Sequence, residues 1–130
     1  MSDLSSTEEN RILTEWVDAN TVWLGIHETD EGNDPDGTTE FDATDYDRQA
    51  LNAADVTISG GGPTTLTNDA DIVFTESADS EWGEADFGVL WDSETGGDPR
   101  SSAVSLTNGG TVSEGIEFKI EAGDLTFDLD

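Results

Sequence analysis

The chain has 130 residues and carries 31 acidic residues against four Lys and Arg, for a formal net charge of −27 at pH 7. Four scattered cations cannot neutralise the phosphates of a nucleic acid, and the negative charge equally opposes binding to an acidic membrane surface. No apolar run approaches the roughly 20 residues that span a bilayer, and the first ten residues lack the basic and apolar regions of an ordinary secretory signal. We therefore expect one domain over residues 1–130, with no nucleic-acid partner and no membrane insertion.

The charge also indicates the solvent in which the chain folds. A compact domain with this charge repels itself in dilute buffer, but at molar salt the Debye length falls to about 3 Å and exposed like charges hardly interact. The alternative is an acidic disordered tail, and such tails contain few aromatic residues. This sequence has four Trp, five Phe and one Tyr distributed along its length. We interpret it as a folded, halophilic protein.

The first predicted element is a helix over about residues 6–19. Ser6 and Glu9 have the spacing of a capping box, and Asn20 tolerates the left-handed conformation in which many helices end. The apolar residues between them recur at helical spacing on one face: Ile12, Leu13, Trp16 and Val17. This face should pack on the body of the protein.

The rest of the chain, about residues 21–130, has the pattern of short strands. Apolar, β-branched and aromatic runs occupy residues 21–27, 45–52, 56–58, 70–74, 82–91, 103–106, 116–120 and 125–129, with Gly-rich turns between most of them. We predict a mainly β fold, an antiparallel β-sandwich or jelly-roll-like single domain with one N-terminal α-helix. The aromatic residues expected in its core are Trp16, Trp23, Phe74, Phe87, Trp91, Phe118 and Phe127.

Residues that could carry chemistry are few. The sequence has no Cys and a single His, His27, so thiolate zinc sites and paired-histidine metal sites are excluded. Carboxylates are so abundant that any two of them resemble a catalytic pair, and the pattern therefore predicts nothing. We expect no catalytic residue and no cofactor, and hence no enzyme activity.

Two weaker site hypotheses remain. Asp30, Asp34 and Asp36 lie in a Gly-containing loop and could form a weak cation loop, because hard cations prefer several oxygen ligands. A solvated acidic loop is the simpler interpretation. Trp82 precedes Gly83 and is a candidate exposed aromatic residue, of the kind that binds sugars.

The order of the segments resembles a family of virion proteins from tailed viruses, described as tail-fibre-like or head-decoration proteins. The resemblance covers most of the chain in collinear order, and no single motif is specific. It rests on residues 9–13 in the helix, 22–27 in the first strand, the Asp/Gly-rich loop 30–37, Tyr46-Asp47-Arg48-Gln49-Ala50, residues 82–89, the turn 95–97 and residues 123–127. The acidic residues depart from the family pattern and suit a halophilic version from a virus of haloarchaea.

The resemblance implies a structural protein on the virion surface, made in the host cytoplasm of a high-salt cell. It would decorate the head as a turret or belong to a tail fibre, dock to capsid or tail proteins, and possess an outer face for a host receptor. The alternative is a halophilic cellular module that binds carbohydrate or protein. The family brings no catalytic residues.

We also expect a symmetric homo-oligomer, a trimer or pentamer, because a small β domain leaves strand edges that need cover. High charge opposes association, so subunit contacts should concentrate where acid is sparse, at residues 56–66 and 103–112. Residues 30–47 should face the solvent.

Overall fold

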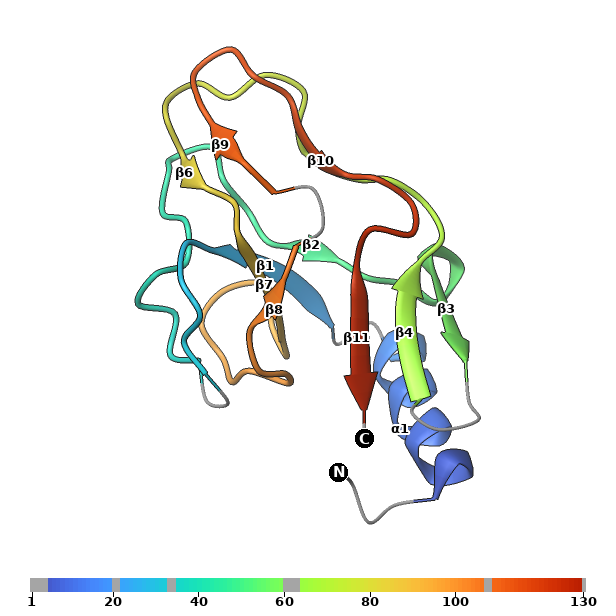
Figure 1. The fold of residues 1–130 in the computed structure, drawn as a ribbon. Coiled ribbons are helices and arrows are strands. Elements are labelled where there is room, and N and C mark those ends of the chain that lie inside the picture. Colours follow the sequence, from blue (N-terminus) through green and yellow to red (C-terminus); the bar gives the residue numbers. More distant parts are fainter. Residues whose placement is uncertain (1–4, 20–21, 33–34, 60–63, 107–108, 130) are drawn as a thin grey trace.

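The computed structural model describes residues 5–19, 22–32, 35–59, 64–106 and 109–129. Their elements are α1 (Ser6–Asp18), β1 (Trp23–His27), β2 (Gln49–Ala50), the 3-10 turn η1 (Ala53–Asp55), β3 (Val56–Ser59), β4 (Thr64–Asn68), β5 (Ile72–Thr75), β6 (Gly83–Glu84), β7 (Phe87–Trp91), β8 (Val104–Ser105), β9 (Thr111–Val112), β10 (Phe118–Ile120) and β11 (Thr126–Leu129) (Figure 1). The prediction of a mainly β fold with one helix near the N-terminus is confirmed. No helix in this part of the chain has the length and apolar character needed to cross a membrane.

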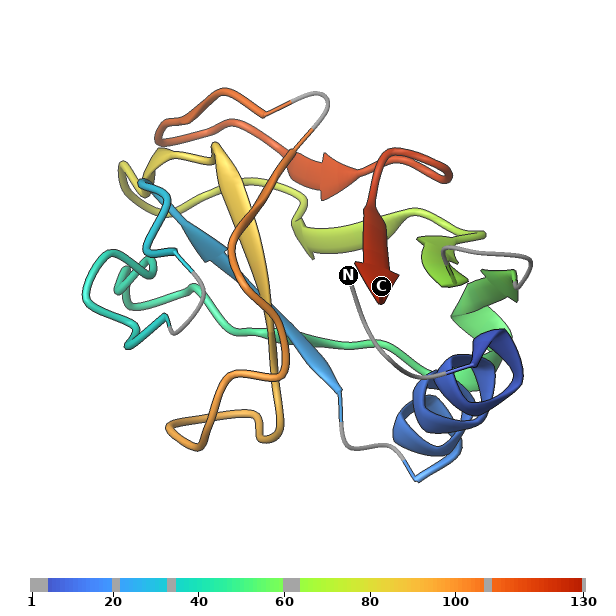
Figure 2. The ribbon, with the colours of Figure 1, turned by 60° about the horizontal axis from the view of Figure 1, so that its bottom comes forward.

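The strands divide among four small antiparallel sheets around a shared core. The largest has the strand order β2-β1-β7-β8, the next β11-β4-β3, and the two smallest are the pairs β10-β5 and β6-β9. Helix α1 lies beside β3 and β4 (Figures 1 and 2). The predicted antiparallel body is therefore present, built from several short sheets.

Helix α1 begins one residue earlier than the capping pattern suggested. Ser5 is the N-cap, and its side-chain oxygen accepts from the Glu8 amide at 3.2 Å. The prediction of Ser6 as the cap is wrong because the two serines are adjacent and each has Glu three residues later, so spacing alone does not choose between them. The helix ends at Asp18, and the expected stop, Asn20, lies outside the described residues.

Four of the seven aromatic residues expected in the core are buried, namely Phe74, Trp91, Phe118 and Phe127. The other three, Trp16, Trp23 and Phe87, are half-buried, so the prediction that most of each side chain is covered holds for them as well. Trp23 and Phe87 each occupy the first position of a strand, where the sheet has less cover. Trp16 packs against the edge of the core, and the guanidinium of Arg100 lies over its ring, 4.9 Å from the ring centroid.

The central pair of strands, β1 and β7, is buried on both faces. Leu24 pairs with Leu90 and Gly25 with Val89, so alternate residues point to opposite sides. On the side called here the core face, Leu24, Ile26, Gly88 and Leu90 pack against the apolar interior. On the opposite side, called here the loop face, lie Trp23, Gly25, His27, Phe87, Val89 and Trp91.

The loop face is covered by the chain between β1 and β2. Its residues 39–41 run beside the end of β1, where the Glu28 amide donates to the Thr39 carbonyl at 3.0 Å and the Phe41 amide to the Ile26 carbonyl at 2.9 Å. The cover brings charged side chains over a sheet surface that is otherwise apolar. Two of the buried polar residues of the described structure, His27 and Arg48, lie here.

Candidate functional site

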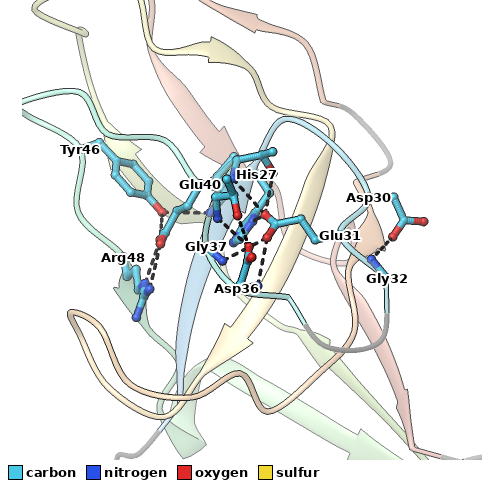
Figure 3. Close-up of polar contacts among 12 residues, drawn as sticks. His27, Asp30, Glu31, Gly32, Asp36, Gly37, Glu40, Tyr46 and Arg48 are labelled. Carbon is cyan, nitrogen blue, oxygen red and sulfur yellow. Dashed lines mark hydrogen bonds and ion pairs between the residues drawn. The ribbon is translucent and has the colours of Figure 1, made fainter.

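A carboxylate, Glu31, holds the loop to the end of β1 (Figure 3). His27 is fully buried at the last position of β1, and its Nδ1 hydrogen-bonds Glu31 Oε2. The same Oε2 accepts from the Thr39 hydroxyl at 2.6 Å and the Thr39 amide at 3.2 Å. Glu31 Oε1 accepts from the Asp36 and Gly37 amides at 3.1 and 3.0 Å. One side chain thus satisfies three backbone amides of the loop.

These contacts fix the charge of Glu31. Burial by itself raises the pKa of a carboxyl group, but the hydrogen bonds from Thr39, His27 and Asp36 together hold the pKa of Glu31 well below its usual range. The carboxylate is therefore ionised in the folded protein at any pH at which ordinary carboxyl groups are ionised.

A second carboxylate, Glu40, pairs with Arg48 at the middle of the loop face. Arg48 Nε and Nη2 donate to the two oxygens of Glu40, each at 2.8 Å, and the two side chains are only 7% and 13% exposed. Arg48 Nη1 donates to the carbonyls of Ser93 and Gly96 at 2.9 and 2.8 Å. A bidentate Arg–carboxylate pair of this kind fixes the orientation of both side chains and also neutralises their charges.

Each member of the Arg48–Glu40 pair also contacts an aromatic side chain, Trp91 for Arg48 and Tyr46 for Glu40. The guanidinium lies over the Trp91 ring, 4.1 Å from its centroid. Tyr46 donates its hydroxyl proton to Glu40 Oε2 at 2.7 Å and accepts from the Ile26 amide at 2.9 Å. Burial first, and then the neighbouring Glu40 charge, raise the pKa of Tyr46 well above its usual value. The phenol stays neutral and joins the loop to β1.

Gly25 makes room for this arrangement. A Cβ at residue 25 would lie 2.6 Å from Glu40 Oε2 and 2.9 Å from Trp91 Nε1, closer than real Cβ contacts come. Only glycine lets both side chains lie flat on the strand. His27 also stacks against Trp91, with ring centroids 5.9 Å apart and planes at 11°.

This cluster fastens the loop to the β1–β7 pair, and we call it the clamp. Its members are His27, Glu31, Glu40, Tyr46, Arg48 and Trp91. Its charged groups are paired and buried, and His27 is not exposed to solvent at all. Within the described residues, His27 Nε2 and Trp91 Nε1 are buried without a hydrogen-bond partner, which costs stability. The expectation that the protein is not an enzyme stays a prediction.

The predicted cation loop overlaps the clamp. Asp30 Oδ1 accepts from the Gly32 amide at 2.8 Å, and Asp36 Oδ1 accepts from the Thr38 amide at 3.0 Å, so each carboxylate closes its own turn. Asp34 lies outside the described residues. Among those described, no group of three or more His, Asp or Glu side chains could hold a metal ion. Cation binding by Asp30, Asp34 and Asp36 stays a prediction.

The prediction of Trp82 as an exposed aromatic residue is wrong. Trp82 is 5% exposed, its Nε1 donates to Asp45 Oδ1 at 2.8 Å, and its ring meets Phe41, Tyr46 and Phe118 edge-on. The adjacent glycine does not mark an exposed surface. Gly83 is needed for its backbone conformation, because its φ is 119° and a Cβ there would collide with Glu28. The buried indole removes the basis of the sugar-binding hypothesis.

A cleft opens where β9 and β10 separate. These strands follow each other in sequence, joined by residues 113–117, yet in the described structure β9 pairs with β6 and β10 with β5 (Figure 1). The tip between them is tied to Ala78, whose carbonyl accepts from the Gly115 amide at 2.8 Å and whose amide donates to the Ile116 carbonyl at 3.0 Å. We call the space between the strands the hairpin cleft.

The hairpin cleft has a volume of about 510 Å³ and two walls of consecutive residues. One wall is Leu106 with residues 109–112, and the other is residues 117–121 with Asp124. Consecutive lining residues mean that each wall presents a strand edge rather than one face of a strand. Neither the cleft nor the central role of Glu31 has a signal in the sequence, since Glu31 is one of 31 acidic residues.

The described residues thus form small antiparallel sheets with paired, buried charges and an open cleft at two strand edges. Over residues 7–128 the chain matches the family described as Gp80, the podophage GP4 fiber I protein gp80, and it belongs to this family of viral fibre proteins. No curated protein and no solved structure matches it. The resemblance to tailed-virus fibre proteins is thereby confirmed at the level of the family.

Proposed function

We propose that this protein is a structural component on the surface of a tailed-virus particle, where it docks to other virion proteins and contributes to attachment to the host. The observation that carries the proposal is the family match over residues 7–128. The clamp supports it, because a loop fixed by buried ion pairs gives a rigid surface suited to permanent assembly.

The placement in the particle is part of the proposal. A tail fibre agrees with the family description, and a head turret or decoration would use the same kind of docking surface. Exposed strand edges favour assembly into a closed ring, a trimer or a pentamer, that matches an axis of the particle.

Purified particles test the proposal directly. Mass spectrometry should find the chain at a fixed copy number relative to the major capsid protein, and antibody labelling in electron micrographs should mark the tail or the head surface. Absence from washed particles, with the chain recovered only from infected-cell extract, would contradict a structural role.

The proposed habitat is a brine, and the net charge of −27 motivates a first prediction. The unfolding temperature should fall as salt is lowered from molar concentration to about 0.1 M, where the Debye length has grown to about 10 Å. Thermal unfolding followed by circular dichroism measures this. A midpoint that is unchanged or higher at low salt would rule out the halophilic interpretation.

Light scattering in molar salt tests the oligomer. We expect a trimer or pentamer, with contacts nearer to residues 56–66 and 103–112 than to residues 30–47. Hydrogen exchange compared between dilute and concentrated samples would locate the contacts. A strict monomer in molar salt would contradict the homo-oligomer. The chain would then have to be held on the particle by another virion protein.

A further inference from the structure

The hairpin cleft lies between two strand edges that have no strand beside them in the described structure. β9 uses one edge to pair with β6, and β10 uses one edge to pair with β5. An edge strand presents a row of backbone N–H and C=O groups that can pair with another chain. A strand placed in the cleft would join the two small sheets in the order β6-β9-strand-β10-β5.

The wall formed by β10 has two chemically different sides. Phe118 and Ile120 are buried, at 7% and 5% exposure, whereas the alternate positions Glu117, Lys119 and Glu121 point outward. On the other wall, Val112 is buried and Thr111 is exposed. A strand between these walls would place alternate side chains beside apolar residues and beside charged ones.

The charge on the outward side is negative. Lys119 Nζ lies 3.7 Å from Asp71 Oδ2 and 3.9 Å from Glu117 Oε1, so its positive charge is already shared between two carboxylates. Glu121 and Asp124 add further negative charge to the lining. The field of the whole chain, at −27, has the same sign. Electrostatic complementarity therefore favours Lys or Arg on the incoming strand.

A second copy of this chain does not supply such a strand. Its long acid-free stretches are residues 56–68 and 99–113. In their described parts these already form β3, β4, β8 and β9, each paired along one edge at least. A strand that enters between two walls needs both edges free. The occupant must come from a different polypeptide.

We infer that the hairpin cleft receives an extended segment of another virion protein, in which apolar residues alternate with Lys or Arg over about five residues, the length of the 117–121 wall. Backbone pairing to both walls supplies the affinity, and the alternation supplies the specificity. The inference rests on the proposed function for the source of the segment and on the geometry alone for its chemistry.

The test uses the full chain at about 1 M salt, where long-range attraction is screened. The probe is a blocked peptide with a Val-Lys-Val-Lys-Val centre, compared with its Val-Glu-Val-Glu-Val counterpart and with a version whose central Val is replaced by Pro. Calorimetry measures binding, and hydrogen exchange locates it. We expect one basic peptide per chain and slower exchange of amides in residues 109–112 and 117–121.

Two variants test the location. Gly110 lines the cleft, and a Cβ added there would meet no other atom within 4 Å, so Gly110→Leu should fill the space and abolish binding while thermal unfolding stays near that of the parent. Glu121→Lys should weaken the basic peptide about twofold, the small effect of an exposed charge screened by salt. Glu76→Lys, an exposed position outside the cleft lining, makes the same charge change and should have no effect.

Several outcomes would overturn the inference. These are no saturable binding of the basic peptide at millimolar concentration, equal binding of the Pro version, or protection outside the two walls. Self-association that protects both walls without peptide would make a second copy the occupant. Peptide binding with the chain absent from particles would contradict the proposed function alone, and a particle-bound chain without peptide binding would contradict the inference alone.

Discussion

The core face and the loop face of the β1–β7 pair are buried to a similar degree by opposite means. On the core face, Leu24, Ile26 and Leu90 are covered by apolar side chains. On the loop face, the cover consists largely of ion pairs and of carboxylates that accept backbone N–H groups. The comparison shows that an acidic chain can use a few of its many carboxylates to order a loop whose apolar anchors, Phe41 and Tyr46, are few.

Breaking the ion pair on the loop face should have the largest effect. Arg48→Met keeps the length of the side chain but leaves Glu40 buried without its cation, and we expect a loss of about 3–5 kcal/mol in the free energy of unfolding. Urea unfolding at molar salt measures it. Arg48→Met combined with Glu40→Gln should recover part of the loss, because the uncompensated charge is then gone. A loss no greater than that of an exposed ion pair would contradict the clamp.

The core face provides the matching apolar variant. Leu24 is fully buried, and Leu24→Ala should cost about 2–5 kcal/mol through lost apolar contacts and the remaining cavity. Because no charge is involved, the loss should be the same at pH 6 as at about pH 3, below the ordinary carboxyl pKa. Urea unfolding at both pH values checks this. A strongly pH-dependent loss would mean that the two faces do not differ as described.

Glu31→Gln should have a smaller effect that depends on pH. Gln keeps the shape but loses the charge that accepts the loop amides, and we expect a loss of about 1.5–3 kcal/mol near pH 6, the range for hydrogen bonds to charged groups. The folded-state pKa of Glu31 is lowered, so its stabilisation is complete above the unfolded carboxyl pKa of about 4.3 and declines as the pH falls below it.

The difference between the parent and Glu31→Gln should therefore shrink between pH 6 and about pH 3. Glu114→Gln, at an exposed position, removes the same charge and should change stability little at either pH. A difference that grows in acid would show that the Glu31 pKa is not lowered by folding.

An exposed ion pair gives the smallest expected effect. Arg11 lies on the surface of α1 between Glu8 and Glu15, and its Nε donates to Glu8 Oε1 at 2.8 Å. The hydrogen bond from Arg11 lowers the pKa of Glu8, but both groups are solvated, and such pairs contribute little. Arg11→Met should change urea unfolding far less than Arg48→Met does. Equal losses would mean that burial does not distinguish the two arginines.

The sequence patterns predict helices and strands better than they predict which side chains are buried by distant segments of the chain. Helix α1 follows from its apolar periodicity, and the strands at residues 23–27 and 87–91 follow from short apolar and aromatic runs. Trp16 and Trp23 have the same kind of pattern, yet they are half-buried because their exposure depends on which distant segment covers them. That information lies in tertiary packing rather than in the spacing of residues.

The candidate site was less predictable for two reasons. Among 31 acidic residues, nothing distinguishes Glu31 and Glu40 from their solvated neighbours until the loop folds back on β1. The hairpin cleft arises because β9 pairs with β6 and β10 with β5, whereas the sequence patterns predict no strand at residues 111–112 and no pairing partners. Trp82 beside Gly83 illustrates the opposite error, since a local signal of exposure was overruled by Asp45 and three aromatic rings.

Lys119 is the only lysine in the sequence, and it stands one-third exposed on the outward side of β10. An amine-reactive reagent thus has one lysine target among these 130 residues, situated on a wall of the hairpin cleft. A fluorophore or cross-linker attached there on the purified chain would report occupancy of the cleft by an added peptide, without any substitution in the chain.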